Sequence, residues 1–287
     1  MIIPRNVQKA GDPMPEAKTQ AELDFERKHA EDLERIRNFR LMDDDFMSKV
    51  FEEKECAAFL LKVILNRDDL TVREVHGQHD LKNLQGRSVR LDILAVDESG
   101  RMYNIEVQRS DRGAGAKRAR YNSSLLDANL TEKGDGYEAL NETYVIFITE
   151  RDVLKRGLPI YHIDRTIKET GEAFGDEAHI IYVNAQIRDE TALGRLMHDF
   201  ACTDPKEMFY PVLARRVRYF KEDTKGVGGM CRAMEEMRNE AAREATHKKA
   251  IETALAMLAD EMPYEKVAKY AGLTVDEVKA LVSKKTA

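Results

Sequence analysis

Apolar and polar residues alternate in two neighbouring runs of the chain, residues 88–96 and 102–108. Both runs are rich in Ile, Val and Leu, and residues 97–101 between them include Asp, Ser and Gly, which favour turns. The pattern therefore predicts a β-hairpin. Because side chains two positions apart share a face of a strand, Glu106 is expected to lie in a polar row on one face, and Asp92 can lie across the hairpin from that row.

The pattern on either side of the hairpin predicts a mixed sheet flanked by helices. A helix, three strands, a second helix and a fourth strand follow one another at residues 43–65, 70–78, 88–96, 102–108, 117–131 and 144–149. An apolar run at 179–183 is expected to extend the sheet, and residues 154–177 are expected to form loop with some helix. The expected fold class is α/β, with an αβββαβ order and a mixed central sheet.

The two ends of the chain differ from this central part. Residues 1–19 carry three prolines and no periodic apolar face, which predicts a mobile tail. Residues 21–37 are highly charged, so they form either a solvated helix or a segment that orders only on a partner. The C-terminal region is expected to be helical, with helices at 191–200, 205–221, 230–258, 262–270 and 275–284 and a flexible glycine-rich break at 226–229.

The two acids of the hairpin are the main candidates for chemistry. An acid in a strand is most often a solvent-facing residue of an edge hairpin. Asp92 and Glu106 in adjacent strands would repel each other in a half-buried sheet unless a cation or a proton lies between them, and such oxygen ligands suit Mg²⁺ or Mn²⁺. Residues 109–120, which follow, contain five basic residues and one acid, a local charge suited to a phosphodiester.

The run Arg90-Leu91-Asp92, followed after a turn by residues 104–108 with Glu106 and Gln108, resembles the motif of the PD-(D/E)XK nuclease superfamily in its E-x-Q form. More narrowly, the chain resembles the PD-(D/E)XK nuclease family transposases, the recombination-promoting nuclease (Rpn) group. Other parts of the chain fit the same family: Asp45-Phe46, Val50-Phe51, residues 121–125, and residues 136–140 leading into the strand at 144–148. On this basis the expected divisions are 1–37, a nuclease-like domain at 38–200, a helical extension at 201–225 and a helical module at 226–287.

The resemblance implies a Mg²⁺-dependent DNA endonuclease with a restriction-endonuclease-like core, linked to recombination or mobile elements. Asp92 and Glu106 match the metal-binding acids, the backbone carbonyl of Val107 matches a further ligand, and Asp45 is the candidate for an acid from the first helix. Gln108 occupies the position that is usually Lys. Its amide can position a water but cannot supply a charge or take a proton at neutral pH.

Basic residues near the motif are the candidate DNA contacts: Arg109, Lys117, Arg118 and Arg120. The alternative for such arginines is an ordinary solvated helix face. A catalytically inactive relative that serves as a nucleic-acid or protein interaction module also remains open, because of Gln108 and the net charge of −6. An acidic protein must contact DNA through local basic patches.

The remaining features concern compartment and partners. The three cysteines are widely spaced and form no C-x-x-C pair, which favours reduced thiols in a cytoplasmic protein. The sequence has no apolar run of membrane-spanning length and no signal-peptide pattern. The last two helices resemble a helix-turn-helix, but Asp276 and Glu277 at the start of the second would repel phosphate. We therefore expect the C-terminal helices to serve packing or homo-oligomerisation.

Overall fold

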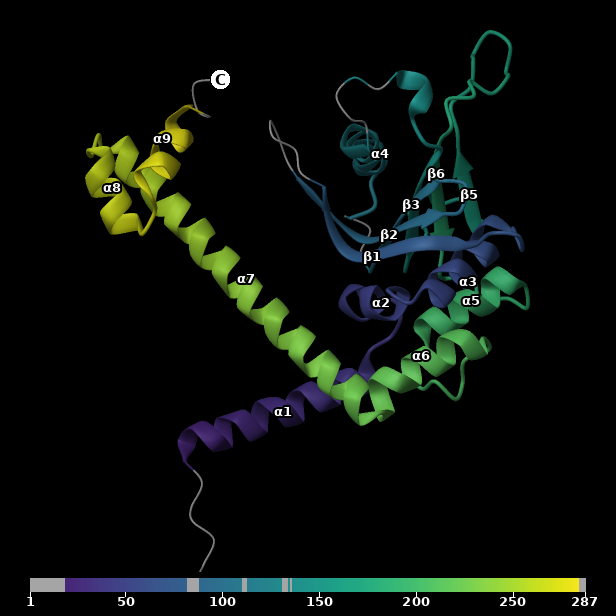
Figure 1. Ribbon diagram of the computed structural model, residues 1–287, viewed down its shortest axis with the longest axis horizontal. Coiled ribbons are helices and arrows are strands. Elements are labelled where there is room, and N and C mark those ends of the chain that lie inside the picture. Colours follow the sequence, from purple (N-terminus) through teal and green to yellow (C-terminus); the bar gives the residue numbers. More distant parts are fainter. Residues whose placement is uncertain (1–18, 82–87, 110–112, 131–133, 135, 284–287) are drawn as a thin grey trace, which may run out of the picture. The chain divides into compact units, whose positions relative to one another are not determined.

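The computed structural model describes residues 19–81, 88–109, 113–130, 134 and 136–283 (Figure 1). The predicted tail falls almost entirely on residues 1–18, outside the described part. The chain forms two compact units, Met1–Lys221 and Glu222–Ala287, and each is described by itself. The charged segment near the start is a helix, α1 (Gln20–Asn38).

A six-stranded mixed sheet forms the centre of the first unit. The strands are β1 (Val72–Leu81), β2 (Val89–Asp97), β3 (Met102–Gln108), β4 (Thr143–Thr149), β5 (Ile160–Ile163) and β6 (Ala178–Asn184). Their order across the sheet is β1-β2-β3-β4-β6-β5. β3 pairs in parallel with β4, and β4 with β6, whereas the other pairs are antiparallel. The predicted hairpin, the fourth strand and the added strand at 179–183 are confirmed.

Helices cover both faces of this sheet. α4 (Ala116–Leu130) lies on one face, and α2 (Asp44–Phe51), α3 (Lys54–Leu65) and α5 (Ala192–Ala201) lie on the other (Figure 1). Because both faces are covered, β3 is buried along its length except for the half-buried Gln108 at its end. The α/β class and the αβββαβ order, α3-β1-β2-β3-α4-β4, are confirmed.

Two predicted elements of the first unit are wrong, and the helix expected at 43–65 is divided into α2 and α3. Residues 154–177 form no helix but carry β5 and a bridge between Thr166 and Ala173. Lys155 and three glycines in this segment have positive φ angles, between 55° and 75°, which a right-handed helix does not permit. The helix expected at 205–221 begins only at Pro211, as α6 (Pro211–Glu222), because proline is suited to the first turn of a helix.

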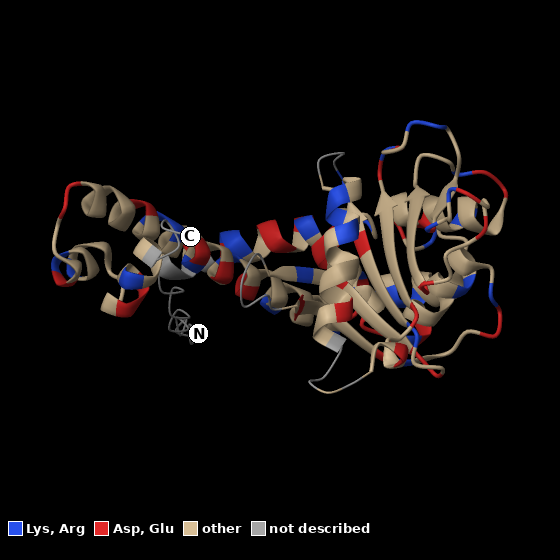
Figure 2. Cartoon of the chain, turned by 90° about the horizontal axis from the view of Figure 1, so that it is seen from above, with Lys and Arg blue, Asp and Glu red and all other residues tan. Residues whose placement is uncertain are grey.

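The second unit contains α7 (Thr224–Ala259), α8 (Tyr264–Ala271) and α9 (Val275–Ser283). The expected flexible break at 226–229 is wrong, since those glycines lie inside α7. The Asp223 side chain caps this helix by accepting from the N–H groups of Lys225 and Gly226, which satisfies donors that a helix start otherwise leaves free. Figure 2 shows basic and acidic residues interspersed along α7.

The predicted pair of short helices is confirmed as α8 and α9, joined at Gly272, which has a φ of 73°. Val267 and Val278 pack together with Ala254 of α7 in a small core. Thr274 and Glu277 form a reciprocal capping box, in which the Glu277 carboxylate accepts from the Thr274 N–H at 2.7 Å. This acid therefore has a local role in starting α9.

Candidate metal centre

Asp92 of β2 and Glu106 of β3 lie next to each other at the end of their ladder. The last paired residues are Ile93 and Ile105, and one step further the same antiparallel register brings Asp92 opposite Glu106. Residues directly opposite in such a pair point to the same face. The N–H of Val107 donates to Oδ2 of Asp92 across 2.9 Å, so the Asp92 side chain provides the acceptor at this point. The structure brings the two candidate acids together.

Burial gives both acids an unusual preference for the protonated form. Glu106 has no exposed side-chain surface (0%). Burial raises the pKa of Glu106, and the negative charge of Asp92 raises it further, while Arg118 lowers it. Burial also raises the pKa of Asp92, against the lowering effect of the Val107 N–H. Two such carboxyl groups favour a shared proton or a cation between them.

One oxygen of Glu106 lacks a well-formed hydrogen bond within the described residues, although the neighbouring Asn104 side chain lowers the pKa of this carboxyl group. Oε2 accepts from Arg118, whereas Oε1 is buried and accepts no hydrogen bond from the described residues. A buried acceptor without a donor is costly, and Mg²⁺ binds carboxylate oxygens readily. The donor set of Asp92 and Glu106 therefore fits a hard divalent cation, with the carbonyl of Val107 as the predicted third oxygen.

Arg118 approaches Glu106 from α4. Its Nη2 donates to Oε2 of Glu106 at 2.7 Å, and its Nη1 donates to the carbonyl of Gly113 at 2.9 Å. The guanidinium carbon lies 5.8 Å from the centroid of the Phe147 ring, and the side chain stays 39% exposed. A residue expected to contact DNA phosphate is thus bound to one of the metal-site acids.

Gln108 lies at the end of β3, two residues beyond Glu106 and on the same face. Its side chain packs against Gly113: a Cβ at that glycine would be 1.6 Å from Oε1 of Gln108 and 3.3 Å from Nη1 of Arg118. The absence of a side chain at position 113 therefore leaves the room that the Gln108 amide occupies beside the acids. From there the amide can hydrogen-bond a water.

The start of α2 adds negative charge to this region. Asp44 is exposed and Asp45 is half-buried. Both raise the pKa of Asp92, and Asp44 has the stronger effect. The sequence pointed to Asp45 alone. The sequence shows three consecutive acids at 43–45. Because it does not give the orientation of the helix that begins there, it could not predict which of them acts most strongly on Asp92.

The other candidate DNA contacts differ in their surroundings. Arg109 is exposed, and its Nη1 lies 2.9 Å from Oδ1 of Asp43, just before α2. Lys117 and Arg120 are exposed on α4. Residues 110–112 of the basic segment lie outside the described part of the chain.

Comparison with known proteins assigns the central part of the chain to one family. Residues 45–192 match the model of one protein family, described as PD-(D/E)XK nuclease family transposase. No curated protein and no solved structure matches the chain. Among the described helices, none combines the length and apolar character needed to span a membrane.

The matched segment includes α2 from Asp45 onward, α3, the hairpin with both acids, the basic helix α4 and all six strands of the sheet. Nucleases of this superfamily generally use divalent metal ions, in agreement with the carboxylate pair. The family implies a nuclease or transposase type of function and a DNA substrate. With a match over more than half of its length, the chain belongs to the PD-(D/E)XK nuclease family transposases.

Proposed function

We propose that this chain is a Mg²⁺-dependent endodeoxyribonuclease that acts in DNA recombination or on mobile elements, with Mn²⁺ as a possible substitute ion. The observation that carries the proposal is the buried Oε1 of Glu106 beside Asp92, which accepts no well-formed hydrogen bond from the described residues. Family membership indicates a nuclease reaction. The buried oxygen indicates that a cation would be stabilised between Asp92 and Glu106.

Asp92, Glu106 and the carbonyl of Val107 would hold the ion. When bound, it lowers the pKa of a coordinated water and neutralises charge on the phosphoryl group. The amide of Gln108, kept in place beside Gly113, orients the attacking water through hydrogen bonds. Since Gln108 cannot accept the proton of that water, proton removal depends on solvent or on a carboxylate such as Asp44 or Asp45.

The DNA backbone would lie along the exposed basic side of α4. Lys117 and Arg120 are available there for phosphate contacts, and Arg109 lies beside the start of α2. The protein's net charge of −6 disfavours a general attraction to DNA. Binding then depends on these few local contacts, and log K should fall with log salt by only about 0.9 for each phosphate contacted.

Nicking of supercoiled plasmid in Mg²⁺ tests the proposed activity. Asp92→Asn and Glu106→Gln should each abolish nicking, whereas Glu98→Gln, in the exposed turn of the same hairpin, should cut at the parental rate. Circular dichroism checks that each variant is folded. Equal cutting by the parent and Asp92→Asn would show that this acid pair is not the active site.

An inactive interaction module is the second candidate, and two observations favour it. Gln108 stands in the usual Lys position, and Arg118 already occupies Oε2 of Glu106. Titration calorimetry with Mg²⁺, combined with the nicking assay, distinguishes the enzyme from the inactive module. Mg²⁺ binding that is lost in Glu106→Gln, together with nicking by the parent, supports the enzyme. DNA binding without Mg²⁺ binding or nicking supports the module.

We also propose that the second unit mediates self-association. A groove of about 320 Å³ lies between the end of α7 and α9, lined by apolar side chains such as Leu255, Leu258, Met262 and Leu281 together with Tyr264 and Glu261. Light scattering of the full chain tests this role. Parent dimers that become monomers in Leu258→Glu would support it, and a monomeric parent would exclude it.

A further inference from the structure

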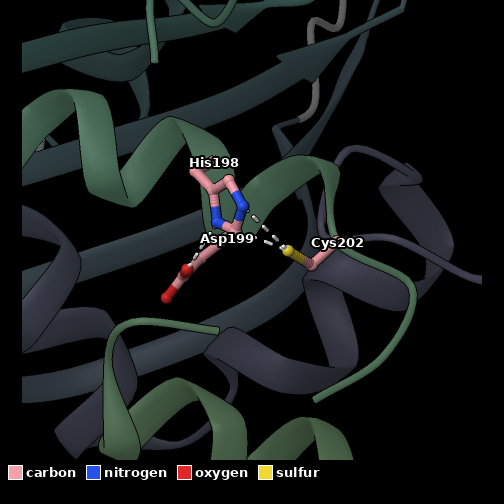
Figure 3. A group of neighbouring side chains, drawn as sticks. All are labelled: His198, Asp199 and Cys202. Carbon is pink, nitrogen blue, oxygen red and sulfur yellow. Dashed lines mark hydrogen bonds and ion pairs between the residues drawn. The ribbon is translucent and has the colours of Figure 1, made fainter. Parts of the chain in front are cut away.

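A second group of metal-ligating side chains lies at the C-terminal end of α5. His198 and Asp199 are in its last turn, and Cys202 follows it (Figure 3). Within the described residues, these three side chains are a group whose ligand atoms all lie within 4.8 Å of one another. Figure 3 shows the imidazole between the carboxylate and the thiol.

Two distances in this group match those between neighbouring ligands of a tetrahedral metal site. Nδ1 of His198 lies 3.4 Å from Oδ1 of Asp199 and 3.4 Å from Sγ of Cys202. With zinc–ligand bonds of about 2.0–2.3 Å, neighbouring ligand atoms of a tetrahedron are about 3.3–3.6 Å apart. One ion can therefore contact the nitrogen, the oxygen and, after a small rotation of the Cys202 side chain, the sulfur.

The surrounding loop holds the first two ligands in place. Asp199 is fully buried (0% exposed), and its two oxygens accept from the N–H groups of Phe209 at 2.8 Å and Tyr210 at 2.9 Å. A carboxylate oxygen can accept at two positions, so each keeps a free direction. The His198 ring packs edge-on against Phe209, with centroids 4.7 Å apart. Such support of the ligands is what fixes a metal-site geometry.

We propose that His198, Asp199 and Cys202 bind one Zn²⁺, with water as the fourth ligand. Imidazole and thiolate select a transition metal, whereas the oxygen-only pair of Asp92 and Glu106 suits Mg²⁺. Zinc displaces the thiol proton to solvent, and the two negative ligands then balance the charge of the ion. The bound ion would join the end of α5 to the segment before α6.

This position also connects to the segment that leads into α2. The N–H of Met42 donates to the carbonyl of Phe200 at 3.0 Å, one residue after Asp199. Met42 comes just before the acids at 43–45. A zinc ion at the end of α5 would therefore stabilise the part of the backbone from which α2 begins.

Cobalt substitution tests the site without any measurement of nuclease activity. The full-length Asp92→Asn/Glu106→Gln variant, which lacks the Mg²⁺ ligands, is freed of metal with a chelator and titrated with Co²⁺. We expect one equivalent to produce the absorption bands of tetrahedral cobalt and a thiolate-to-cobalt charge-transfer band. Zn²⁺ should then displace the cobalt and abolish both.

Variants identify the ligands. In the same background, Cys202→Ser should lose the charge-transfer band and His198→Gln should lose the tetrahedral spectrum. Cys231→Ser, a cysteine in α7, should behave as its background does. Circular dichroism shows whether each variant is folded. If Cys202→Ser does not fold, the spectrum of His198→Gln tests the proposed site. A missing charge-transfer band in the background protein, or one that persists in Cys202→Ser, would overturn the proposal.

Discussion

Arg118 and Glu106 form an ion pair of 2.7 Å between α4 and β3, in which the acid is fully buried and the base is partly exposed. The pair places a positive charge beside one oxygen of the carboxylate, while the other oxygen, Oε1, accepts no well-formed hydrogen bond within the part of the chain that the structure describes. The positive charge partly offsets the repulsion between Glu106 and Asp92. Arg118 therefore contributes to the electrostatics of the candidate metal site as well as being a candidate DNA contact.

Arg118→Gln should lower the stability of the fold by about 1–3 kcal/mol, because it leaves the buried Glu106 carboxylate without its charged partner. Arg120→Gln, two residues along the same helix but exposed, should change stability by less than about 0.5 kcal/mol. Urea denaturation of both variants at neutral pH provides the comparison. Equal stabilities would mean that the pair makes no net contribution.

Asp92→Asn should stabilise the metal-free protein at neutral pH. The raised pKa of Asp92 means that the folded state holds its proton more tightly than the unfolded state does, so the parent loses stability as pH rises from about 4, the ordinary carboxyl value. Asparagine has no such titration, and its oxygen still accepts from Val107. Thermal melts in EDTA should show a difference that is small at pH 4 and grows toward pH 7. A constant difference would contradict the raised pKa.

Mg²⁺ should raise the melting temperature of the parent. A ligand that binds only the folded state raises the free energy of unfolding by RT ln(1 + [L]/Kd), about 2.7 kcal/mol when the ligand concentration is a hundred times Kd. Glu106→Gln should show no such rise, whereas Glu98→Gln should respond as the parent does. Differential scanning calorimetry at several Mg²⁺ concentrations measures this, with the same series in Ca²⁺ as a test of ion selectivity.

Gly113→Ala should displace the Gln108 side chain, because the new methyl group would occupy the position of its amide oxygen. If Gln108 orients the attacking water, plasmid nicking should slow while Mg²⁺ affinity remains unchanged. Gly115→Ala is the matched control, since a Cβ there meets no atom within 4 Å. An unaltered nicking rate in Gly113→Ala would remove the positioning role of Gln108.

Lys117→Gln/Arg120→Gln should weaken DNA binding about equally for all sequences. Each lost phosphate contact should reduce the slope of log K against log salt by about 0.9. Fluorescence anisotropy with the Asp92→Asn background, which prevents cutting, allows the measurement. Lys168→Gln, exposed in the segment between β5 and β6, should leave the slope unchanged. An unchanged slope in the double variant would place the DNA elsewhere.

The hairpin and the position of its acids could be predicted because strand alternation has a period of two and a short turn fixes the register. One residue of slippage would have moved Glu106 to the opposite face. The inward direction of Arg118 could not be predicted, since it depends on how α4 crosses the sheet. Asp44 raises the pKa of Asp92 more than Asp45 does, and this difference depends in the same way on how α2 approaches the sheet.

The errors elsewhere have a similar origin. The glycines at 226–229 suggest a break when considered alone, but the cap at Asp223 starts a helix that passes through them. The residues after Glu150 have weak periodicity, and left-handed residues such as Lys155 cannot be identified from sequence patterns. The four-residue spacing of His198 and Cys202 is visible in the sequence, but the position of Asp199 depends on a loop ten residues away and could not be predicted.

The Asp92 carboxylate, a proposed metal ligand, also accepts the hydrogen bond from the Val107 N–H that joins β2 to β3. An alanine at position 92 would remove a proposed metal ligand and also leave a strand amide without its acceptor, so a loss of activity in that variant would have two causes. Inactive versions of this protein intended for crystallisation with DNA should therefore keep an oxygen at position 92. Selection for activity would then also preserve the alignment of the two strands.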